Sequence, residues 1–188
     1  LTISRLEAQQ GLPEERVALA PMLLTLEREA QALSRGQHQI HCEDRLGMDL
    51  RGSAAYLHSA FSNLVSNAVR YTPSGGHISI RLERHGAGAR LAVTDTGHGI
   101  PDAHIPRLAE RFYRVSTSRS RELGGTGLGL SIVKHVLHLH QARLTIESAV
   151  GRGSTFACQF GEERLLPRLP DNDEGQVPDA DRHNSIPD

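Results

Sequence analysis

The sequence predicts a domain of the α/β class, and three observations support this prediction. Apolar residues recur at helical spacing in residues 21–35, 53–71 and 130–137. In several shorter segments they alternate with polar residues, as in half-buried strands. Two glycine-dense turns, at residues 97–99 and 124–129, interrupt the pattern, and glycine lets a backbone approach a ligand closely. We therefore expect helices and strands in one domain, with a ligand site at its glycine turns.

The composition excludes several classes of protein. The chain has 188 residues, which suffice for one domain with a hydrophobic core, and its formal net charge of -1 gives no electrostatic reason to expect a nucleic-acid partner. No apolar run reaches the length of a membrane-spanning helix, so we expect a cytoplasmic chain without direct membrane contact. The two cysteines, Cys42 and Cys158, are far apart in sequence and are expected to be free thiols.

The eleven histidines of the chain raise the question of a metal site. Three of them, His135, His138 and His140, fall in one predicted helix with spacings of three and two. Only the first pair faces the same way, and no cysteine or carboxylate of ligand spacing joins them, so we do not expect zinc.

The first half of the chain combines helices with short strands. Helices are expected at residues 1–10, 21–35 and 53–71, and strands at residues 37–42 and 48–50. The chain does not begin with Met, and its first helix is expected to be the end of a longer one. Gly36 ends the second helix, and Ser53 can cap the third, because its hydroxyl can accept a free N–H of the first turn.

The second half adds two strand pairs. Strands are expected at residues 77–84, 90–95, 143–148 and 154–160, and a short helix at residues 101–111. Each pair is joined by a glycine-containing turn, so both pairs are predicted to be antiparallel. From residue 163 on, proline and aspartate replace the residues that form cores, which predicts a disordered tail over residues 163–188.

The helix predicted for residues 53–71 carries a polar face of unusual composition. Asn63, Asn67 and Arg70 follow the spacing i, i+4 and i+7, which places them on one side. Mg²⁺ prefers oxygen ligands and keeps waters and substrate phosphates in its shell, so an asparagine amide could hold it. The guanidinium of Arg70 could bind a phosphate. The alternative is a pair of surface asparagines without a role.

The first glycine turn follows a carboxylate. Asp95 ends a predicted strand just before Gly97-His98-Gly99. Its carboxylate could accept a hydrogen bond from the exocyclic amine of adenine, whereas the carbonyl of guanine would be repelled. The alternative is a simple Asp-Thr-Gly turn, a position that aspartate favours.

The second glycine turn opens a helix whose start has little side-chain cover. Free N–H groups at such a helix start can bind phosphate. Before this turn, Phe112-Tyr113-Arg114 forms an apolar anchor for residues 115–126, which are rich in serine, threonine, arginine and glycine. We expect a mobile loop that closes over a nucleotide, with Arg114, Arg119 and Arg121 near phosphates. The alternative is an ordinary solvated loop.

Other nucleotide-binding motifs are absent from the sequence. Neither glycine turn is followed by lysine at the place that a P-loop requires, and the spacing of the second turn differs from the dinucleotide fingerprint. The His-Arg-Asp catalytic loop of protein kinases is also missing.

Together these motifs resemble the ATP-binding catalytic domain of bacterial sensor histidine kinases. The resemblance covers residues 53–160 and keeps the order of the motifs. The asparagine box, first glycine box, phenylalanine box, second glycine box and closing glycine turn of that family are similar to residues 63–73, 95–100, 112–114, 125–130 and 151–156.

The resemblance implies a Bergerat fold, a two-layer α/β sandwich in which a mixed sheet packs under three helices. It implies ATP and Mg²⁺ as cofactors, with Asn67 on the metal, Asp95 on the adenine amine, Tyr71 near the base and Arg70 on phosphate. The implied catalytic residues are Asn67, Arg70 and Arg114. The implied ATP-binding residues are Asn63, Asn67, Arg70, Tyr71, Asp95, Gly97, Gly99, Ile100, Phe112, Gly125, Thr126, Gly127, Leu128, Gly129 and Leu130.

The family phosphorylates a histidine that an acidic residue follows, on a separate dimerisation domain, and none of the eleven histidines here lies in such a string. We therefore expect a fragment: residues 1–12 as the end of the second dimerisation helix, residues 13–162 as the catalytic domain, and residues 163–188 as the tail. The implied partners are the histidine-bearing dimerisation domain of the same kinase and the receiver domain of a response regulator. The full-length protein is expected to be a homodimer anchored in the bacterial inner membrane. Residues 105–114 and 118–121 most resemble the phosphate-regulon branch, which implies phosphate-starvation signalling.

Two other functions remain open from the sequence. ATPases of the chaperone, topoisomerase and mismatch-repair type share the implied fold, but they carry a glutamate one helical turn before the metal-binding asparagine. Here that position is Asn63, which cannot act as a general base. A non-catalytic ATP-binding regulatory module is the third possibility.

Overall fold

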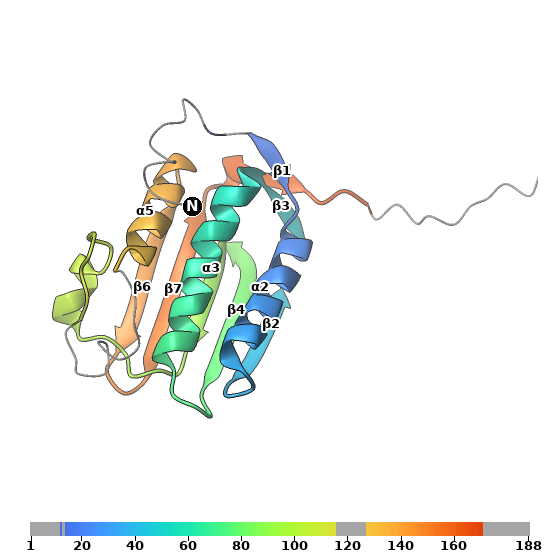
Figure 1. Ribbon diagram of the computed structural model, residues 1–188. Coiled ribbons are helices and arrows are strands. Elements are labelled where there is room, and N and C mark those ends of the chain that lie inside the picture. Colours follow the sequence, from blue (N-terminus) through green and yellow to red (C-terminus); the bar gives the residue numbers. More distant parts are fainter. Residues whose placement is uncertain (1–11, 13, 116–126, 171–188) are drawn as a thin grey trace, which may run out of the picture.

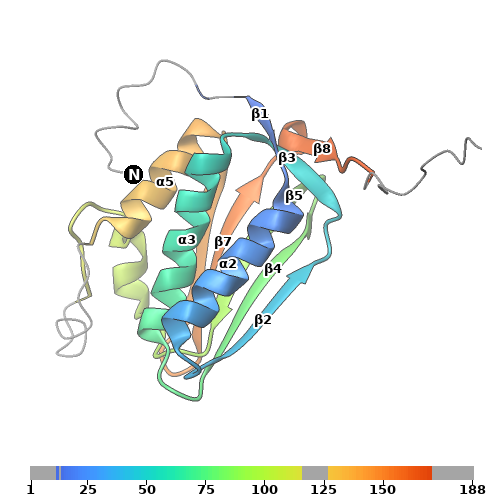
Figure 2. The ribbon, with the colours of Figure 1, turned by 45° about the vertical axis from the view of Figure 1, so that its right-hand side comes forward.

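The computed structural model describes residues 12, 14–115 and 127–170, and its main body has two layers (Figure 1). One layer is a five-stranded sheet in the order β2-β4-β5-β7-β6. Three helices cover one face of this sheet (Figure 2). The strands are β2 (Gln39–Asp44), β4 (His77–His85), β5 (Gly88–Asp95), β6 (Arg143–Ala149) and β7 (Gly153–Phe160), and the helices are α2 (Leu19–Ser34), α3 (Ala54–Tyr71) and α5 (Gly129–Leu139).

The sheet is mixed, as the resemblance implied. β2 pairs with β4 in parallel, and all other neighbours are antiparallel. The expected pairing of residues 77–84 with 90–95 and the expected closing hairpin are both confirmed. Every second residue of β4 points to the helices, so Ile78, Ile80 and Leu82 are buried.

The middle helix, α3, holds the two layers together. Its apolar side chains at helical spacing are buried against the sheet and the flanking helices, and Phe61 meets the ring of Phe160 edge-on. The predicted cap is present, because the Ser53 hydroxyl accepts the N–H of Tyr56 at 3.4 Å. The short helix expected at residues 101–111 is a 3-10 helix, η1 (Asp102–Arg107).

A second, three-stranded sheet corrects the expected tail. β8 (Leu165–Pro167) follows the 3-10 turn η2 (Glu162–Arg164) and pairs with β3 (Met48–Gly52), which also pairs with β1 (Glu15–Val17). The expectation of disorder from residue 163 on is therefore wrong for residues 163–167. The composition gave a misleading signal there because charged side chains, which rarely build cores, are paired in this segment. Residues 1–11, 13 and 171–188 lie outside the described part.

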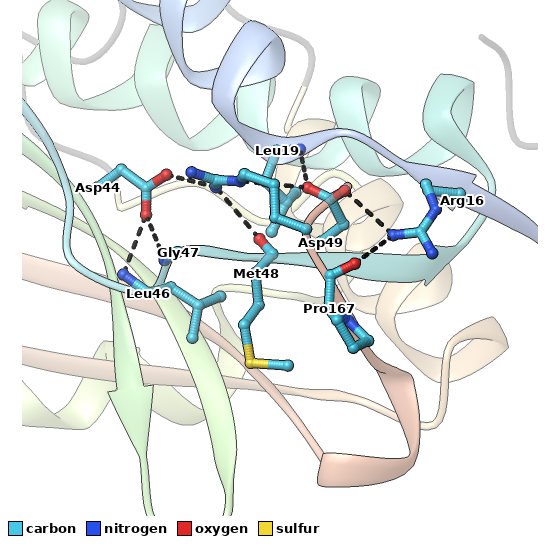
Figure 3. Close-up of polar contacts among 9 residues, drawn as sticks. Arg16, Leu19, Asp44, Leu46, Gly47, Met48, Asp49 and Pro167 are labelled. Atoms are coloured by element: carbon cyan, nitrogen blue, oxygen red, sulfur yellow. Dashed lines mark hydrogen bonds and ion pairs between the residues drawn. The ribbon is translucent and has the colours of Figure 1, made fainter. Parts of the chain in front are cut away.

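Figure 3 shows the ion pairs around this small sheet and the hydrogen bond that joins it to α2. Asp49 of β3 is buried, and its carboxylate accepts the N–H of Leu19 and contacts the guanidinium of Arg16, both at 3.3 Å. Arg168, just after β8, contacts Asp44 at 2.6 Å and Asp49 at 3.7 Å. Both ends of the described chain thus converge on one buried carboxylate.

Both cysteines are free, as expected. Burial raises the pKa of the Cys42 thiol to about 12, and it raises the pKa of Cys158 as well. In the part of the chain that the structure covers, we find no helix of the length and apolar character needed to cross a membrane.

Candidate functional site

The polar face of α3 lies against the beginning of α5. The amide nitrogen of Asn63 donates to the Ser59 carbonyl at 2.8 Å, and its Oδ1 points to Gly129. A Cβ at Gly129 would lie 2.8 Å from that oxygen. Asn67 and Arg70 follow on the same side of α3 and are half-buried. The structure therefore brings the asparagine box and the second glycine box together.

The start of α5 keeps its first N–H groups available. No side chain in the described part of the chain caps the helix, and its first internal bond runs from the N–H of Ile132 to the Leu128 carbonyl. The hydroxyl of Ser131 donates to the same carbonyl, at 2.7 Å. The N–H groups before Ile132 have no partner within the helix, and they form the positive end of its dipole. This end of α5 can therefore bind an anion beside Asn63.

The first glycine turn places a buried carboxylate against the last turn of α3. Asp95 ends β5, and its Oδ1 accepts the N–H of Gly97 at 2.8 Å. A Cβ at Gly97 would lie 2.5 Å from the carbonyl oxygen of Tyr71, so glycine is required for this approach. Burial raises the pKa of Asp95, and hydrogen bonds from the backbone of Gly97 and Ser154 oppose that effect. The Asp95 carboxylate and the Tyr71 carbonyl therefore both lie next to Gly97.

The phenylalanine box meets the second glycine turn through the backbone. The N–H of Phe112 donates to the Gly127 carbonyl at 3.0 Å, and both residues have positive φ, 64° and 70°. The ring of Phe112 is 71% exposed, so it is not a core residue. Tyr113 is held instead: its hydroxyl contacts Nδ1 of His104, and the Arg107 guanidinium lies 4.3 Å from the centre of its ring. Arg114 is half-buried beside them.

Other predicted residues lie at the edges of this region or beyond the described part. Gly99 has a φ of 72° and packs against the backbone of Ala149, and the N–H of Ile100 donates to the Ser148 hydroxyl at 2.8 Å. Leu128 and Leu130 flank the start of α5 and are half-buried. Gly125 and Thr126, together with Arg119, Arg121 and the rest of the expected mobile loop over residues 116–126, are outside the described residues.

Sequence reasoning missed three polar residues that support these motifs. Ser148 and Ser154 contact the first glycine turn from β6 and β7, and His104 holds Tyr113. Serines in alternating strands and a histidine in a short helix have no distinctive spacing, so the sequence carried no signal for them.

Neither the cavities nor a group of metal-ligating side chains marks the position of the candidate site. Two cavities among the described residues measure about 470 and 350 Å³, one beside Arg164 and one on the helix-free face of the sheet around His41 and His77. Neither includes a residue of the α3 polar face. No group of three or more histidine, cysteine or carboxylate side chains in the described ranges could hold a metal ion.

The fold and these motifs define a class of protein. Residues 52–164, more than half of the chain, match the family described as Histidine kinase-, DNA gyrase B-, and HSP90-like ATPase. The chain belongs to this family.

Its curated relatives include sensor histidine kinases. The chain is 51% identical over 167 residues to the phosphate regulon sensor protein PhoR of Pseudomonas aeruginosa, a match that covers 88% of this chain and 38% of that protein. It is 36% identical over 173 residues to the sensor-like histidine kinase SenX3 of Mycolicibacterium smegmatis, covering 91% of this chain and 44% of that protein. The chain therefore spans less than half the length of these two relatives.

Solved structures share the fold. The mycobacterial sensor histidine kinase MprB superposes with a TM-score of 0.68 at 26% identity, over 82% of this chain and 99% of that one. Full-length ShkA in complex with AMPPNP gives a TM-score of 0.72 over 84% of this chain and 33% of that one; at 20% identity this likeness concerns the fold alone. The expected fold class and the expected kinship with the ATP-binding catalytic domains of sensor histidine kinases are confirmed.

Proposed function

We propose that this chain binds Mg-ATP between α3 and the start of α5 and donates the γ-phosphate to a histidine on a separate dimerisation domain. The observation that carries the proposal is the contact between the Asn63 amide and Gly129, which joins a polar helix face to an uncapped helix start. One side supplies oxygen ligands and a guanidinium, and the other supplies N–H groups for phosphate.

The base end of the nucleotide belongs at the first glycine turn. The Asp95 carboxylate accepts from Gly97 through one oxygen and is buried, so a hydrogen bond that it makes to the adenine amine is shielded from water. Tyr71 is 39% exposed next to Gly97, and its ring is available to the base. This arrangement favours adenine over guanine, which presents a carbonyl at that position.

The phosphate end belongs at the face of α3 and the start of α5. Among the described residues the structure gives Asn67 and Arg70 no hydrogen-bond partner, so their polar atoms remain available to Mg²⁺ and to phosphate. An amide oxygen fits a metal that keeps most of its other ligands as water and phosphate oxygens. When bound, Mg²⁺ neutralises charge on the phosphates. Arg70 and Arg114 orient the same phosphates, and phosphoryl transfer depends mostly on such positioning and charge stabilisation.

The identity of residue 63 favours phosphoryl transfer to an acceptor over hydrolysis of ATP. A hydrolase of this family needs a carboxylate near the γ-phosphate to activate water. The chain has Asn63 there, whose amide donates to Ser59 and cannot take up a proton. The chemistry therefore waits for an external acceptor, which the separate dimerisation domain supplies.

The wider role is taken from the relatives. PhoR and SenX3 are named as sensor kinases, and PhoR as the phosphate regulon sensor protein. We place this chain at the cytoplasmic end of a homodimeric, membrane-anchored kinase that passes the phosphoryl group to the receiver domain of a response regulator, in phosphate-starvation signalling.

A labelling experiment tests the proposal. The chain is incubated with γ-labelled ATP and Mg²⁺, alone and together with the dimerisation domain of PhoR. We expect label on the acceptor histidine, no label on the chain itself and little free phosphate; an acceptor with that histidine replaced by alanine is the control. Label on the isolated chain, or brisk phosphate release that the acceptor does not alter, would support an ATPase instead.

A further inference from the structure

The hydroxyl of Ser148, on β6, makes three polar contacts. It accepts the N–H of Ile100 at 2.8 Å, and it lies 3.1 Å from the Gly153 carbonyl and 2.7 Å from the hydroxyl of Ser154. A serine hydroxyl has one donor and two acceptor positions. Since the Gly153 carbonyl can only accept, Ser148 donates to it, and the Ser154 hydroxyl must donate to Ser148. All three positions of Ser148 are then occupied.

These contacts continue to Asp95. Ser154 is the cross-strand partner of Asp95, and its backbone N–H is hydrogen-bonded to the Asp95 carboxylate. Ile100, which Ser148 holds, is the last residue of the first glycine turn, and Asp95 is the residue where the turn begins. Both ends of the turn are therefore attached to one hairpin through two neighbouring serines.

The middle of the turn rests on the same hairpin. The N–H of Gly151 donates to the His98 carbonyl at 2.8 Å. A Cβ at Gly99 would lie 2.0 Å from the Ala149 carbonyl oxygen, so the two backbones are in direct contact. The turn cannot move toward the hairpin, and the Ser148 hydroxyl keeps its far end from moving away. Without that hydroxyl the Ile100 N–H loses its acceptor in a half-buried place, which is costly.

We propose that Ser148 is a positioning residue of the nucleotide site, which holds the Ile100 end of the first glycine turn and so fixes Asp95 and Gly97 toward the base. This inference rests on the proposed function in assuming that Asp95 binds adenine. Ser148 itself does not contact the nucleotide; it acts through Ile100 and Ser154.

The test compares three variants of the chain. Ser148→Ala removes the hydroxyl, and Ser148→Thr keeps it. Thr145→Val removes from the same strand a hydroxyl whose one hydrogen-bond partner among the described residues is Gln159, at 3.5 Å. Affinity for Mg-AMPPNP is measured by calorimetry, the exchange rate of the Ile100 amide by nuclear magnetic resonance, and the thermal midpoint as a check on folding. We expect Ser148→Ala to raise Kd roughly fivefold to tenfold and to speed exchange at Ile100, as the loss of one hydrogen bond allows. Ser148→Thr should restore both values, and Thr145→Val should change neither.

The outcomes separate this inference from the proposed function. Wild-type Kd and wild-type protection of Ile100 in Ser148→Ala would overturn the inference, as would an equal loss of affinity in Thr145→Val. If the unmodified chain bound no nucleotide, the proposed function would fail, and so would a positioning role in that site. The Ile100 exchange rates would still decide whether Ser148 holds the turn.

Discussion

The polar groups at the two ends of α3 differ in their hydrogen bonding. At its beginning, the N–H of Ser53 donates to Nε2 of His140 at 3.1 Å, and Nδ1 of that ring donates to the Val136 carbonyl at 2.7 Å. His140 is fully buried, with both ring nitrogens in use. At the other end, Asn67 and Arg70 have no hydrogen-bond partner among the described residues, and the neighbouring start of α5 has no side-chain cap.

The pairing of polar groups suggests that the two ends of α3 have different roles: the beginning stabilises the fold, and the other end is the candidate ligand site. Buried polar groups in folded proteins are almost always paired, because an unpaired group loses its bonds to water without replacement. At the beginning of α3 the chain itself supplies the partners of Ser53 and His140, so these polar contacts serve the fold. At the end of α3, Asn67 and Arg70 are half-buried and find no partner among residues 14–115 and 127–170. In the proposed function, Mg-ATP supplies their partners.

The largest effect is expected from Asn67. Asn67→Ala removes the proposed oxygen ligand of Mg²⁺, and we expect phosphoryl transfer to the acceptor domain to fall at least about 100-fold, since losing even an outer partner of a metal ligand typically costs 10- to 100-fold. Ser66→Ala is the matched control, because within the described ranges the Ser66 hydroxyl bonds only the backbone of its own helix, at 3.1 Å. Equal transfer by both variants would remove Asn67 from the site.

Glycines at the two ends of α3 should respond differently to an added methyl group. A Cβ at Gly52 would lie 2.4 Å from the buried ring of His140, so Gly52→Ala should lower the free energy of unfolding by about 1–3 kcal/mol without changing the nucleotide affinity of the folded chain. A Cβ at Gly97 would meet the Tyr71 carbonyl, so Gly97→Ala should lower both the free energy of unfolding and the nucleotide affinity. Urea unfolding and calorimetry measure the two quantities. The comparison breaks down if Gly52→Ala weakens binding as much as Gly97→Ala.

Asp95→Asn should weaken binding without weakening the fold. We expect the affinity for an ATP analogue to fall by about 1–3 kcal/mol, because an amide cannot reproduce the carboxylate as an acceptor for both Gly97 and the base.

Burial raises the pKa of Asp95 in the folded chain, so the folded state holds the proton more tightly than the unfolded state. The unfolding free energy of the wild type therefore declines as pH rises from about 4 through the raised pKa. The variant should lack this decline, which unfolding curves across that pH range would reveal; an unchanged pH dependence would contradict it.

The smallest effect concerns pH and His140. Burial lowers the pKa of His140, with the charge of Arg164 adding to that effect, and the neutral ring accepts the N–H of Ser53. Below the unfolded pKa of about 6.5 the unfolded state binds a proton that the folded state does not, so the free energy of unfolding should fall by at most about 1.4 kcal/mol per pH unit as pH decreases. His140→Gln can accept and donate without titrating in this range, and it should lose this dependence. An acid loss in the variant as large as that of the wild type would contradict this role of His140.

Part of the fold and site could be predicted from the sequence because the signals are local. Helical and alternating spacing located α2, α3, α5 and the antiparallel strands, since each pattern reports which side of an element faces a core. The cap at Ser53 follows from backbone chemistry within a few residues. The stop expected at Gly36 comes slightly earlier, because α2 ends at Ser34 and Arg35 takes the left-handed cap position. The strings around Asn67, Asp95 and Gly129 identified the family in the same way.

The tertiary structure decided what depends on residues far apart in the chain. Local composition could not predict that β8 pairs with β3, because charges such as Arg168 find their partners more than a hundred residues away. It could not predict that Ser148 holds Ile100, because a serine in a strand has no pattern of its own. The residues with distinctive spacing could therefore be recognised from the sequence. The partners that hold them in place are chosen by contacts that form only when the sheet and helices have packed.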